Sequence, residues 1–252
     1  MKISIITVSF NSEKTIRDTM ESIHNQTYSD IEHIVIDGKS TDSTLNIVSQ
    51  YPVSKIISEY DNGIYDAMNK GIKEATGDFI GFLNSDDVYN DLGCIESIAL
   101  KLKENLSIDM IFGNILIVSH KNISKILRFN NPGTHKINSL LKGWLPPHPT
   151  LYVRSSVLRD LNGFNTKYEI QADFELMLRL FEVKKYKSFY LNKILVRQRF
   201  GGASTKISNI LKGNLEASDA CKINGFHGGI FFILRKVFSR IPQFFNRPKI
   251  FS

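Results

Sequence analysis

The sequence predicts an α/β fold in which a doubly wound, mostly parallel β-sheet is followed by a C-terminal helical extension. Strand-like and helix-like patterns alternate through the first half of the chain, and this alternation implies right-handed βαβ crossovers. The run Phe79–Leu83 is apolar on both faces, as the buried strands of parallel sheets usually are. With 252 residues the chain is long enough for one such domain and an extension.

The expected elements of the N-terminal half follow one another in a regular order. Strand patterns occur at Ile3–Ser9, Glu32–Asp37, Lys55–Glu59, Phe79–Leu83 and Met110–Gly113. The stretches between them have the apolar spacing of helices, near Glu13–His24, Thr41–Gln50, Gly63–Ala75 and Leu92–Glu104. Because two parallel strands need a crossover between them, we expect each helix to connect the strands on either side of it.

The pattern changes beyond about residue 114. Ile115–Ser119 and Lys125–Phe129 indicate an antiparallel pair, and the three prolines of residues 145–149 indicate a stiff loop. Further strands are expected at Leu151–Arg154 and Tyr190–Arg199. A helix is expected over Ala172–Lys184, because its apolar residues recur at helical spacing.

The bulk composition is typical of a soluble globular protein, with 42% apolar and 23% charged residues. No segment reaches the roughly 18 continuous apolar residues that a membrane span needs, and no signal-peptide pattern precedes the first strand. Cys94 and Cys221 match no metal or redox spacing. We therefore expect two reduced thiols in a cytoplasmic protein.

The net charge of +7 is concentrated at the C-terminus. Beyond Asp219 the chain has six basic residues and no acidic one, so this tail carries +6 of the total. A nearly neutral body with a basic tail favours a surface anchor and gives no indication of a nucleic-acid partner. Within residues 228–245 an apolar helical face lies opposite Arg235, Lys236 and Arg240. This pattern predicts peripheral contact with a membrane, or else a helix that packs on the body or on a second copy.

An acidic cluster, Asn84-Ser85-Asp86-Asp87, directly follows the strand at Phe79–Leu83. In open α/β sheets, ligands bind just beyond the carboxyl ends of the strands. Carboxylate oxygens there suit Mg²⁺ or Mn²⁺, which usually share their coordination shell with substrate phosphates. Asn, Ser and Asp are also common in turns, so a plain turn is the alternative interpretation.

Three other strand ends are polar as well. They exit into Thr7, Ser9 and Asn11, into Asp37-Gly-Lys-Ser-Thr-Asp42, and into Glu59-Tyr-Asp-Asn-Gly63. Each segment alone is explained equally well by a turn or a helix cap. Four polar ends in one sheet form a polar rim, and this coincidence favours a nucleotide-like ligand.

Five segments, in this order and spacing, resemble the family 2 glycosyltransferases. They are Thr7-Val-Ser-Phe-Asn11, Asp37-Gly-Lys-Ser-Thr-Asp42, Asp66-Ala-Met-Asn-Lys-Gly71, Ala75-Thr-Gly-Asp78 and Phe82-Leu-Asn-Ser-Asp-Asp87. The resemblance covers roughly residues 1–205. It implies an inverting enzyme with the A-type glycosyltransferase fold and a role in bacterial polysaccharide biosynthesis. The implied donor is a nucleotide sugar, and a UDP-sugar is the donor that we expect.

The resemblance also implies roles for residues at matching positions. Thr7, Ser9 and Asn11 correspond to the segment that holds the nucleotide. Asp37 corresponds to the residue that accepts a hydrogen bond from the base. Asp61 and Lys70 lie in the segment that contacts donor phosphate or ribose.

The place of the family's Asp-x-Asp motif is taken by Asn84-Ser85-Asp86. In the family the last Asp binds the metal and the first contacts the ribose. Asp86 is therefore expected to bind Mg²⁺ or Mn²⁺. Because Asn84 replaces the first Asp, the site lacks one formal negative charge.

Asp173 corresponds to the family's catalytic base, which opens a helix and deprotonates the acceptor hydroxyl. The usual Glu-Asp pair is Ala172-Asp173 here, so the base is retained and its acidic neighbour is lost. An Asp at the start of a helix is also a common N-cap, which is the structural alternative. His148, Arg179 and Gly202 are candidates for acceptor or phosphate contacts, with Gly202 in a glycine-rich loop that resembles a lid.

The predicted reaction is a single displacement at the anomeric carbon, with Asp173 as base and the metal on the leaving diphosphate. The expected acceptor is a glycan or a polyprenyl-diphosphate-linked sugar at the cytoplasmic face of the membrane. We expect a catalytic domain over residues 1–205, with a nucleotide-binding half at 1–113 and an acceptor-binding half at 114–205. Residues 206–252 would form the basic amphipathic extension.

Two other functions remain open. A nucleotidyltransferase also combines a doubly wound sheet with a metal, but it would normally have a glycine-rich first βα turn, which Ser9-Phe-Asn-Ser-Glu13 is not. A catalytically inactive nucleotide-sugar-binding or scaffold protein would be consistent with Asn84 and Ala172. A pair of carboxylates could also serve a glycoside hydrolase. That chemistry needs no polar rim for a nucleotide, so we exclude this function.

Overall fold

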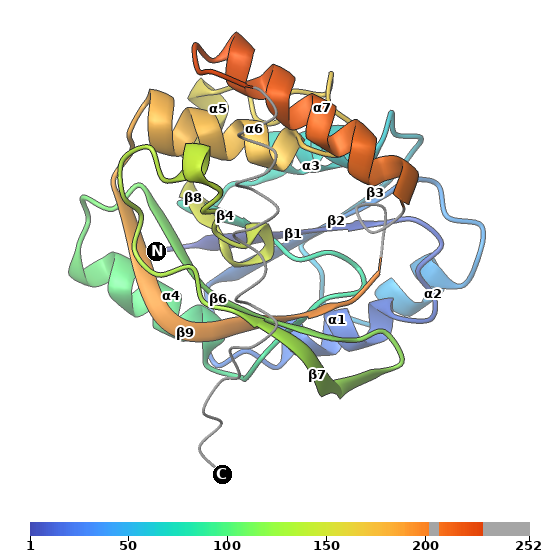
Figure 1. Ribbon diagram of the computed structural model, residues 1–252. Coiled ribbons are helices and arrows are strands. Elements are labelled where there is room, and N and C mark those ends of the chain that lie inside the picture. Colours follow the sequence, from blue (N-terminus) through green and yellow to red (C-terminus); the bar gives the residue numbers. More distant parts are fainter. Residues whose placement is uncertain (202–206, 229–252) are drawn as a thin grey trace.

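A computed structural model describes residues 1–201 and 207–228 of the chain. Its centre is one nine-stranded sheet with the order β3-β2-β1-β4-β8-β6-β9-β5, and β7 pairs with β6 (Figure 1). Helices cover both faces of the sheet, so the predicted doubly wound α/β fold is confirmed. Most of residues 228–245 lies outside the described residues.

The N-terminal half of the sheet is parallel. Its strands are β1 (Ile3–Ser9), β2 (Ile31–Asp37), β3 (Lys55–Ser58) and β4 (Phe79–Phe82). The helices that connect them are α1 (Ile16–His24), α2 (Thr44–Val48) and α3 (Ile64–Glu74). Ser9 lies opposite Asp37, and Asp37 lies opposite Ser58, so the carboxyl ends of three strands meet at one level.

The C-terminal half of the sheet is mixed. It contains β5 (Val88–Tyr89), β6 (Met110–Ser119), β7 (Asn122–Asn130), β8 (Tyr152–Arg154) and β9 (Ser188–Arg199). Strand β8 is antiparallel to β4 and β6, whereas β9 is parallel to β6. The two segments expected at 110–113 and 115–119 are one continuous strand, because β6 first lies between β8 and β9 and then pairs with β7.

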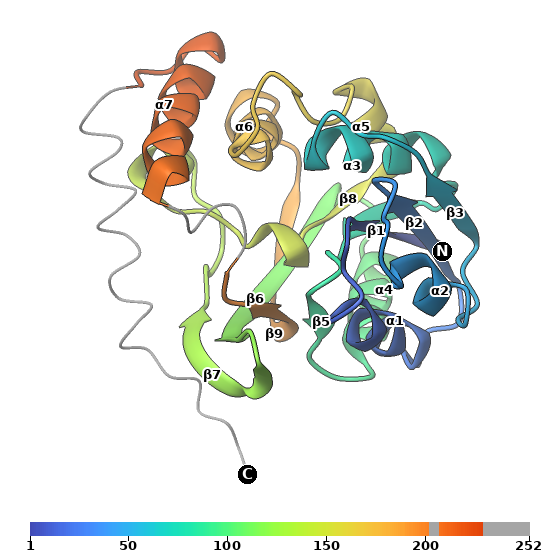
Figure 2. The ribbon, with the colours of Figure 1, turned by 90° about the vertical axis from the view of Figure 1, so that its right-hand side faces the viewer.

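The remaining helices follow β5 in the chain. They are α4 (Cys94–Glu104), α5 (Ser155–Asp160), α6 (Ala172–Leu178) with a π-helical turn at Arg179–Val183, and α7 (Ile207–Ile223). Short 3₁₀ turns occur at Leu140–Lys142 and His148–Thr150. Figures 1 and 2 show α3, α5, α6 and α7 on one side of the sheet and α1 and α4 on the other.

The sheet separates two large apolar clusters. One includes Met68, Phe82, Phe112 and Phe181, and the other includes Phe79, Ile98 and Tyr152. Tyr152 packs directly on the backbone of β4, where a Cβ added to Gly81 would lie 2.3 Å from its ring. A larger residue at position 81 would therefore separate β4 from β8.

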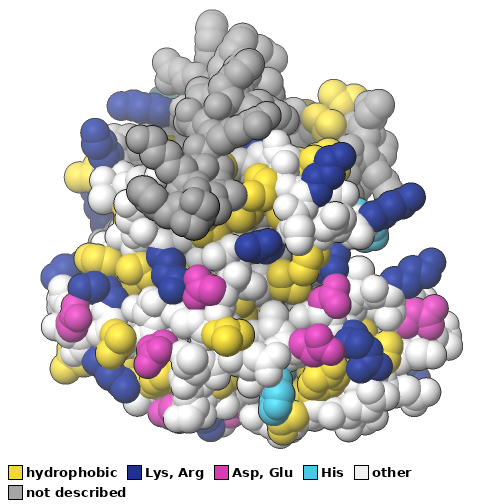
Figure 3. All heavy atoms as spheres, turned by 90° about the horizontal axis from the view of Figure 1, so that it is seen from below, with side chains coloured by type: hydrophobic (Ala, Val, Ile, Leu, Met, Phe, Trp, Pro, Cys, Tyr) yellow, Lys and Arg dark blue, Asp and Glu magenta, His cyan; other side chains and the backbone are white. Residues whose placement is uncertain are grey.

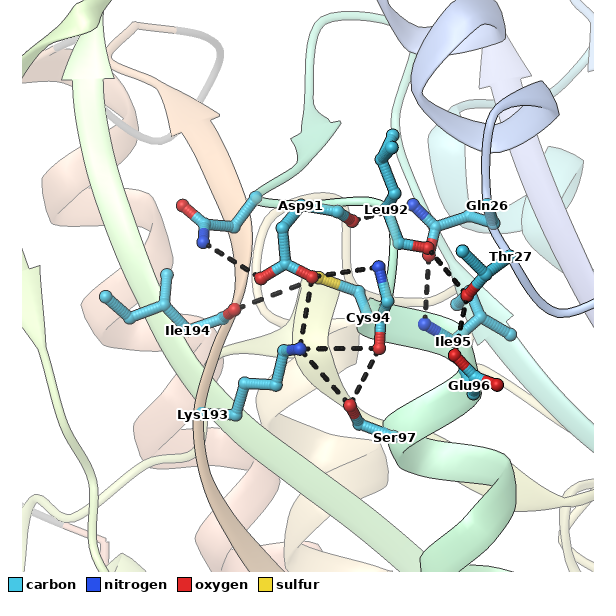
Figure 4. Close-up of polar contacts among 12 residues, drawn as sticks. Gln26, Thr27, Asp91, Leu92, Cys94, Ile95, Glu96, Ser97, Lys193 and Ile194 are labelled. Carbon is cyan, nitrogen blue, oxygen red and sulfur yellow. Dashed lines mark hydrogen bonds and ion pairs between the residues drawn. The ribbon is translucent and has the colours of Figure 1, made fainter.

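A polar cluster joins β9 to the start of α4 (Figure 4). The Lys193 ammonium lies 3.1 Å from the Asp91 carboxylate and donates to Ser97 Oγ at 3.2 Å. Although burial raises the pKa of Asp91, the hydrogen bond from Lys193 holds it below its ordinary value. Burial also raises the pKa of the neighbouring Cys94 thiol to about 12, so this thiol remains protonated.

The face of the molecule seen from below carries charges of both signs (Figure 3). On the face in Figure 3, Lys and Arg side chains are interspersed with those of Asp and Glu. None of the helices within 1–201 and 207–228 is long and apolar enough to cross a membrane.

Candidate functional site

A pocket of about 1000 Å³ lies where β1, β2 and β4 end. Its wall includes seven residues that the sequence predicted as site residues, namely Ser9, Asn11, Asp61, Asn84, Ser85, Asp86 and Asp173. The predicted polar rim is therefore one continuous hollow that reaches from the first strand to the start of α6. Asp86 and Asp173, which are 87 positions apart in the chain, line the same space.

The first βα loop connects the other loops of the rim. Asn11 adopts a left-handed backbone with φ of +46°, and its Oδ1 accepts a hydrogen bond from the Thr41 N–H at 2.9 Å. Ser12 Oγ lies 2.8 Å from Ser85 Oγ in the acidic loop. These contacts hold three strand ends together before any ligand binds, which reduces the ordering that a ligand must cause.

Asp37 does not reach the pocket. Its carboxylate is 0% exposed and accepts four hydrogen bonds from Ser9, Ser58 and the side chain and N–H of Ser40, at 2.5–3.1 Å. Four donors satisfy the lone pairs of a carboxylate, so none is left for a nucleotide base. In this conformation Asp37 holds the rim together, and a hydrogen bond from a nucleotide base to Asp37 stays a prediction.

Asp61 lines the pocket, and Lys70 forms an ion pair with the Asp61 carboxylate. Lys70 Nζ donates to Asp61 Oδ1 at 2.6 Å and lies 2.9 Å from Glu59 Oε1. Burial lowers the pKa of Lys70, but hydrogen bonds with Asp61 and Glu59 outweigh it and raise the pKa overall. The Lys70 ammonium is paired with two carboxylates in this structure, and its contact with donor phosphate or ribose stays a prediction.

The acidic loop offers oxygen atoms to the pocket. Asn84 Oδ1 is buried and has no hydrogen-bond partner among the residues that the structure describes. Burial raises the pKa of Asp86, while the charges of Arg199 and His120 act in the opposite direction. Burial and the charge of Asp86 raise the pKa of the fully buried Asp87 well above its usual range. The loop therefore holds closely spaced carboxyl groups that a bound cation would stabilise in the charged form.

Arg199, at the end of β9, holds this loop in place and was not identified from the sequence. It is 7% exposed, and its guanidinium donates to the Asp86 carbonyl at 2.6 Å and pairs with Asp18 of α1. Its backbone N–H donates to Asp87 Oδ1 at 3.2 Å. An arginine in a strand pattern has no sequence signature that would reveal such contacts, since they depend on how β9 lies against the loop.

Asp173 enters the pocket from the first turn of α6. Its Oδ1 accepts a hydrogen bond from the N–H of Phe174 at 2.7 Å, a local contact that fixes the carboxylate. The Tyr65 hydroxyl, from α3, donates to the Ile170 carbonyl at 2.9 Å. Both Tyr65 and Ile170 line the pocket beside Asp173, so this wall is built from two helices.

Four other expected site residues lie elsewhere or are not described. Thr7 is buried within the sheet, where its hydroxyl lies 3.0 Å from His33 Nε2. His148 stacks on Phe82 at 5.4 Å between ring centroids, and burial lowers its pKa although the charge of Asp173 opposes this. Arg179 pairs with Glu175 and donates to two backbone carbonyls, so it has no direct access to a substrate. Gly202 lies outside the described residues.

The donor set fits a hard divalent cation. No group of three or more His, Cys, Asp or Glu side chains forms a metal site in the described part of the chain. Mg²⁺ and its analogues are, however, commonly held by one or two carboxylates together with substrate phosphates. Asp86 and the unsatisfied Asn84 Oδ1 match such a partial shell.

Comparisons with known proteins agree with this geometry. Residues 4–156 match the family model described as "Glycosyl transferase family 2". The chain is 30% identical over 205 residues to the Escherichia coli UDP-Glc:alpha-D-GlcNAc-diphosphoundecaprenol beta-1,3-glucosyltransferase WfgD, with 80% of this chain and 78% of that protein covered. It is 27% identical over 210 residues to a Mycobacterium tuberculosis PGL/p-HBAD biosynthesis glycosyltransferase, with 81% and 79% covered.

Two solved structures share the fold. S. aureus TarS 1–349 in complex with UDP-GlcNAc superimposes with a TM-score of 0.66 at 19% identity, over 96% of this chain and 73% of that one. The mannosyltransferase PcManGT from Pyrobaculum calidifontis, in complex with GDP-Man and Mn²⁺, superimposes with a TM-score of 0.62 at 13% identity, over 96% and 70%. At these identities the two structures support the architecture and not a particular substrate.

Proposed function

Because the chain belongs to glycosyl transferase family 2 and has the A-type fold, we propose that it transfers a sugar from a UDP-sugar to an acceptor hydroxyl with inversion. The observation that supports this most strongly is that Asp86 and Asp173 line one pocket. One carboxylate could act as the base for the acceptor hydroxyl and the other could hold a metal on the leaving diphosphate, which would serve a single displacement. The acceptor hydroxyl and the donor diphosphate can then lie between them.

The nucleotide would occupy the part of the pocket near β1. Phe10 is 64% exposed there and offers a ring against which a base can stack. Asn11 and Asp61 add polar groups for ribose or phosphate. We prefer UDP because two proteins that this chain resembles, WfgD and TarS, are named with UDP-sugars.

The metal would be held by Asp86, with Asn84 Oδ1 as a neutral neighbour. When bound, Mg²⁺ or Mn²⁺ would neutralise charge on the departing nucleoside diphosphate. The chain itself orients the two oxygens: Arg199 fixes the Asp86 backbone, and Ser85 is tied to the first loop through Ser12. These contacts keep the loop in one arrangement as donor enters.

Asp173 would act as the base that removes the proton from the acceptor hydroxyl. Glu216 of α7 supports this position, because its carboxylate accepts the N–H groups of Ile170 at 2.9 Å and Gln171 at 3.0 Å. Tyr65 holds the Ile170 carbonyl from the other side. The start of α6 is thereby fixed by two other helices, and a positioned base typically contributes 10²–10⁴-fold to the rate, as a rough guide.

The acceptor would be a glycan or a polyprenyl-diphosphate-linked sugar. The name of WfgD includes such a lipid-linked acceptor, and the chain covers 78% of that protein. We assign residues 1–113 to donor binding and 114–205 to acceptor binding, with 206–252 as the extension. We also propose peripheral membrane contact through residues 228–245, which would bring the pocket close to a lipid-linked substrate.

A panel of nucleotide sugars with Mn²⁺ tests this function by the release of nucleoside diphosphate. We expect release from a UDP-sugar, its loss when the metal is chelated, and loss of metal-dependent donor binding in Asp86→Ala. The exposed Asp160→Asn, outside the pocket, serves as a matched control that should behave as wild type. Donor binding without any release would instead favour the inactive binding protein that Asn84 and Ala172 suggest.

A further inference from the structure

The hairpin between β6 and β7 brings a histidine to the donor pocket. His120 lies in the turn after β6, is exposed, and lines the same hollow as Asn84 and Asp86. In the sequence it is 34 positions beyond Asp86 and belongs to none of the motifs singled out above. Only the folding of the hairpin over the end of β9 places it here.

One guanidinium group holds His120 next to Asp86. Arg199 Nη1 donates to the Asp86 carbonyl at 2.6 Å, and its Nε donates to the His120 carbonyl at 3.2 Å. Both bonds go to backbone oxygens, so they fix the two residues and leave both side chains available to a ligand.

The oxygen ligands at this position are few. Asp86 is accompanied by the neutral Asn84, whose Oδ1 has no partner in the described part of the chain. Asp87, the next carboxyl group of the loop, is 0% exposed, so Asp86 and Asn84 are the partly exposed ligands that the loop offers. A pair of one carboxylate and one amide binds a divalent ion weakly on its own. An imidazole nitrogen beside it would add a ligand that transition ions accept and that Mg²⁺, which prefers oxygen, does not.

We propose that His120 is a second side-chain ligand of the metal that Asp86 holds, and that it makes the site select Mn²⁺ over Mg²⁺. This inference rests on the proposed function, since the donor diphosphate completes the coordination shell. The nitrogen ligand adds a donor atom to a site that lacks one formal negative charge at Asn84. The β6–β7 hairpin is thereby part of the donor site and not only an edge of the sheet.

Pulsed electron paramagnetic resonance of Mn²⁺ bound to the full chain with UDP tests the ligand directly. We expect a ¹⁴N hyperfine coupling of a coordinated imidazole in the wild type and its loss in His120→Ala. We also expect the Mn²⁺ dissociation constant to rise roughly tenfold, about 1.4 kcal/mol, with a smaller change for Mg²⁺. The bond from Arg199 survives this substitution because it goes to the backbone carbonyl of position 120.

The control variant is His24→Ala, since His24 is exposed at the end of α1 and does not line the pocket. Its nitrogen coupling should equal that of the wild type. Mn²⁺–UDP binding without nitrogen coupling, or coupling that persists in His120→Ala, would overturn this inference and leave the proposed function intact. A wild-type protein that does not bind Mn²⁺–UDP would overturn both.

Discussion

Asp37 and Asp86 are both carboxylates at strand ends, yet their neighbours give them different tasks. Asp37 accepts four protein hydrogen bonds and is shielded from the pocket. Asp86 lines the pocket and is fixed mainly through its backbone. A residue type and its place in a motif predict that a carboxylate stands at the rim, but the surrounding donors decide whether it can bind a ligand.

Several site residues have no signature in the sequence. Arg199 and His120 come from the second half of the chain and meet the acidic loop only because β9 and the β6–β7 hairpin lie beside it. Phe10 lies within a recognised segment, but its exposure follows from the turn of the loop at Asn11. Such contacts depend on tertiary packing, and the local pattern and spacing of residues in the sequence do not reveal them.

Burial of His33 makes stability depend on pH. Desolvation lowers the pKa of this imidazole to about 3, whereas an unfolded chain protonates histidine near pH 6.5. Between these two values the unfolded state binds one more proton than the folded state. Stability is therefore lost as the pH falls, by about 1.4 kcal/mol per pH unit for this group.

His33→Gln should remove that component while keeping a polar atom near the Thr7 hydroxyl. We expect the unfolding free energy of the variant to fall less steeply than that of the wild type between about pH 6 and pH 4, by about one proton. Urea denaturation at several pH values measures this slope. Equal slopes for the two proteins would contradict a neutral buried His33.

At the scale of elements, the strand patterns were predicted well where apolar runs are long. The strands β1 to β4 appear within a residue or two of their predicted ends, and β1, β2 and β4 are buried along almost their whole length. The two-residue β5 and the short α5 were not expected, because elements of this length carry no periodic pattern. Both form through pairing and packing with residues far away in the chain, as β5 does with β9.

Helix α7 supports the base, and this gives a prediction at the same scale. Glu216 accepts three backbone N–H groups, from residues 169, 170 and 171, just before α6 begins. Glu216→Ala would leave these donors without an acceptor, which costs roughly 1–3 kcal/mol for each buried group. We expect lower thermal stability and a lower kcat with little change in the affinity for donor.

Glu216→Gln keeps one acceptor oxygen and should restore most of both properties. Glu104→Gln is a matched control, because Glu104 is exposed on α4, pairs with Lys101 and does not line the pocket. Thermal denaturation and initial rates at saturating donor separate the two effects. A kcat of Glu216→Ala equal to that of the wild type would contradict the positioning role of α7.

Over the whole molecule, the site joins two halves that the sequence separates. Asn84 and Asp86 follow β4 of the parallel half of the sheet, whereas Asp173 belongs to α6, which lies between β8 and β9 of the mixed half in the chain. The antiparallel β8 pairs with both β4 and β6 and so connects the two halves in one sheet. The relative position of metal ligand and base is therefore a property of the complete sheet.

The most direct test of this account is the anomeric form of the sugar released from an α-linked UDP-sugar, followed by NMR with water as acceptor. Because inversion converts an α-linked donor into a β-product, we expect the β-anomer to appear first in the wild type. In Asp173→Asn the rate should fall by about 10²-fold or more while donor affinity is retained. Release of the α-anomer, or normal turnover in Asp173→Asn, would contradict inversion with Asp173 as the base.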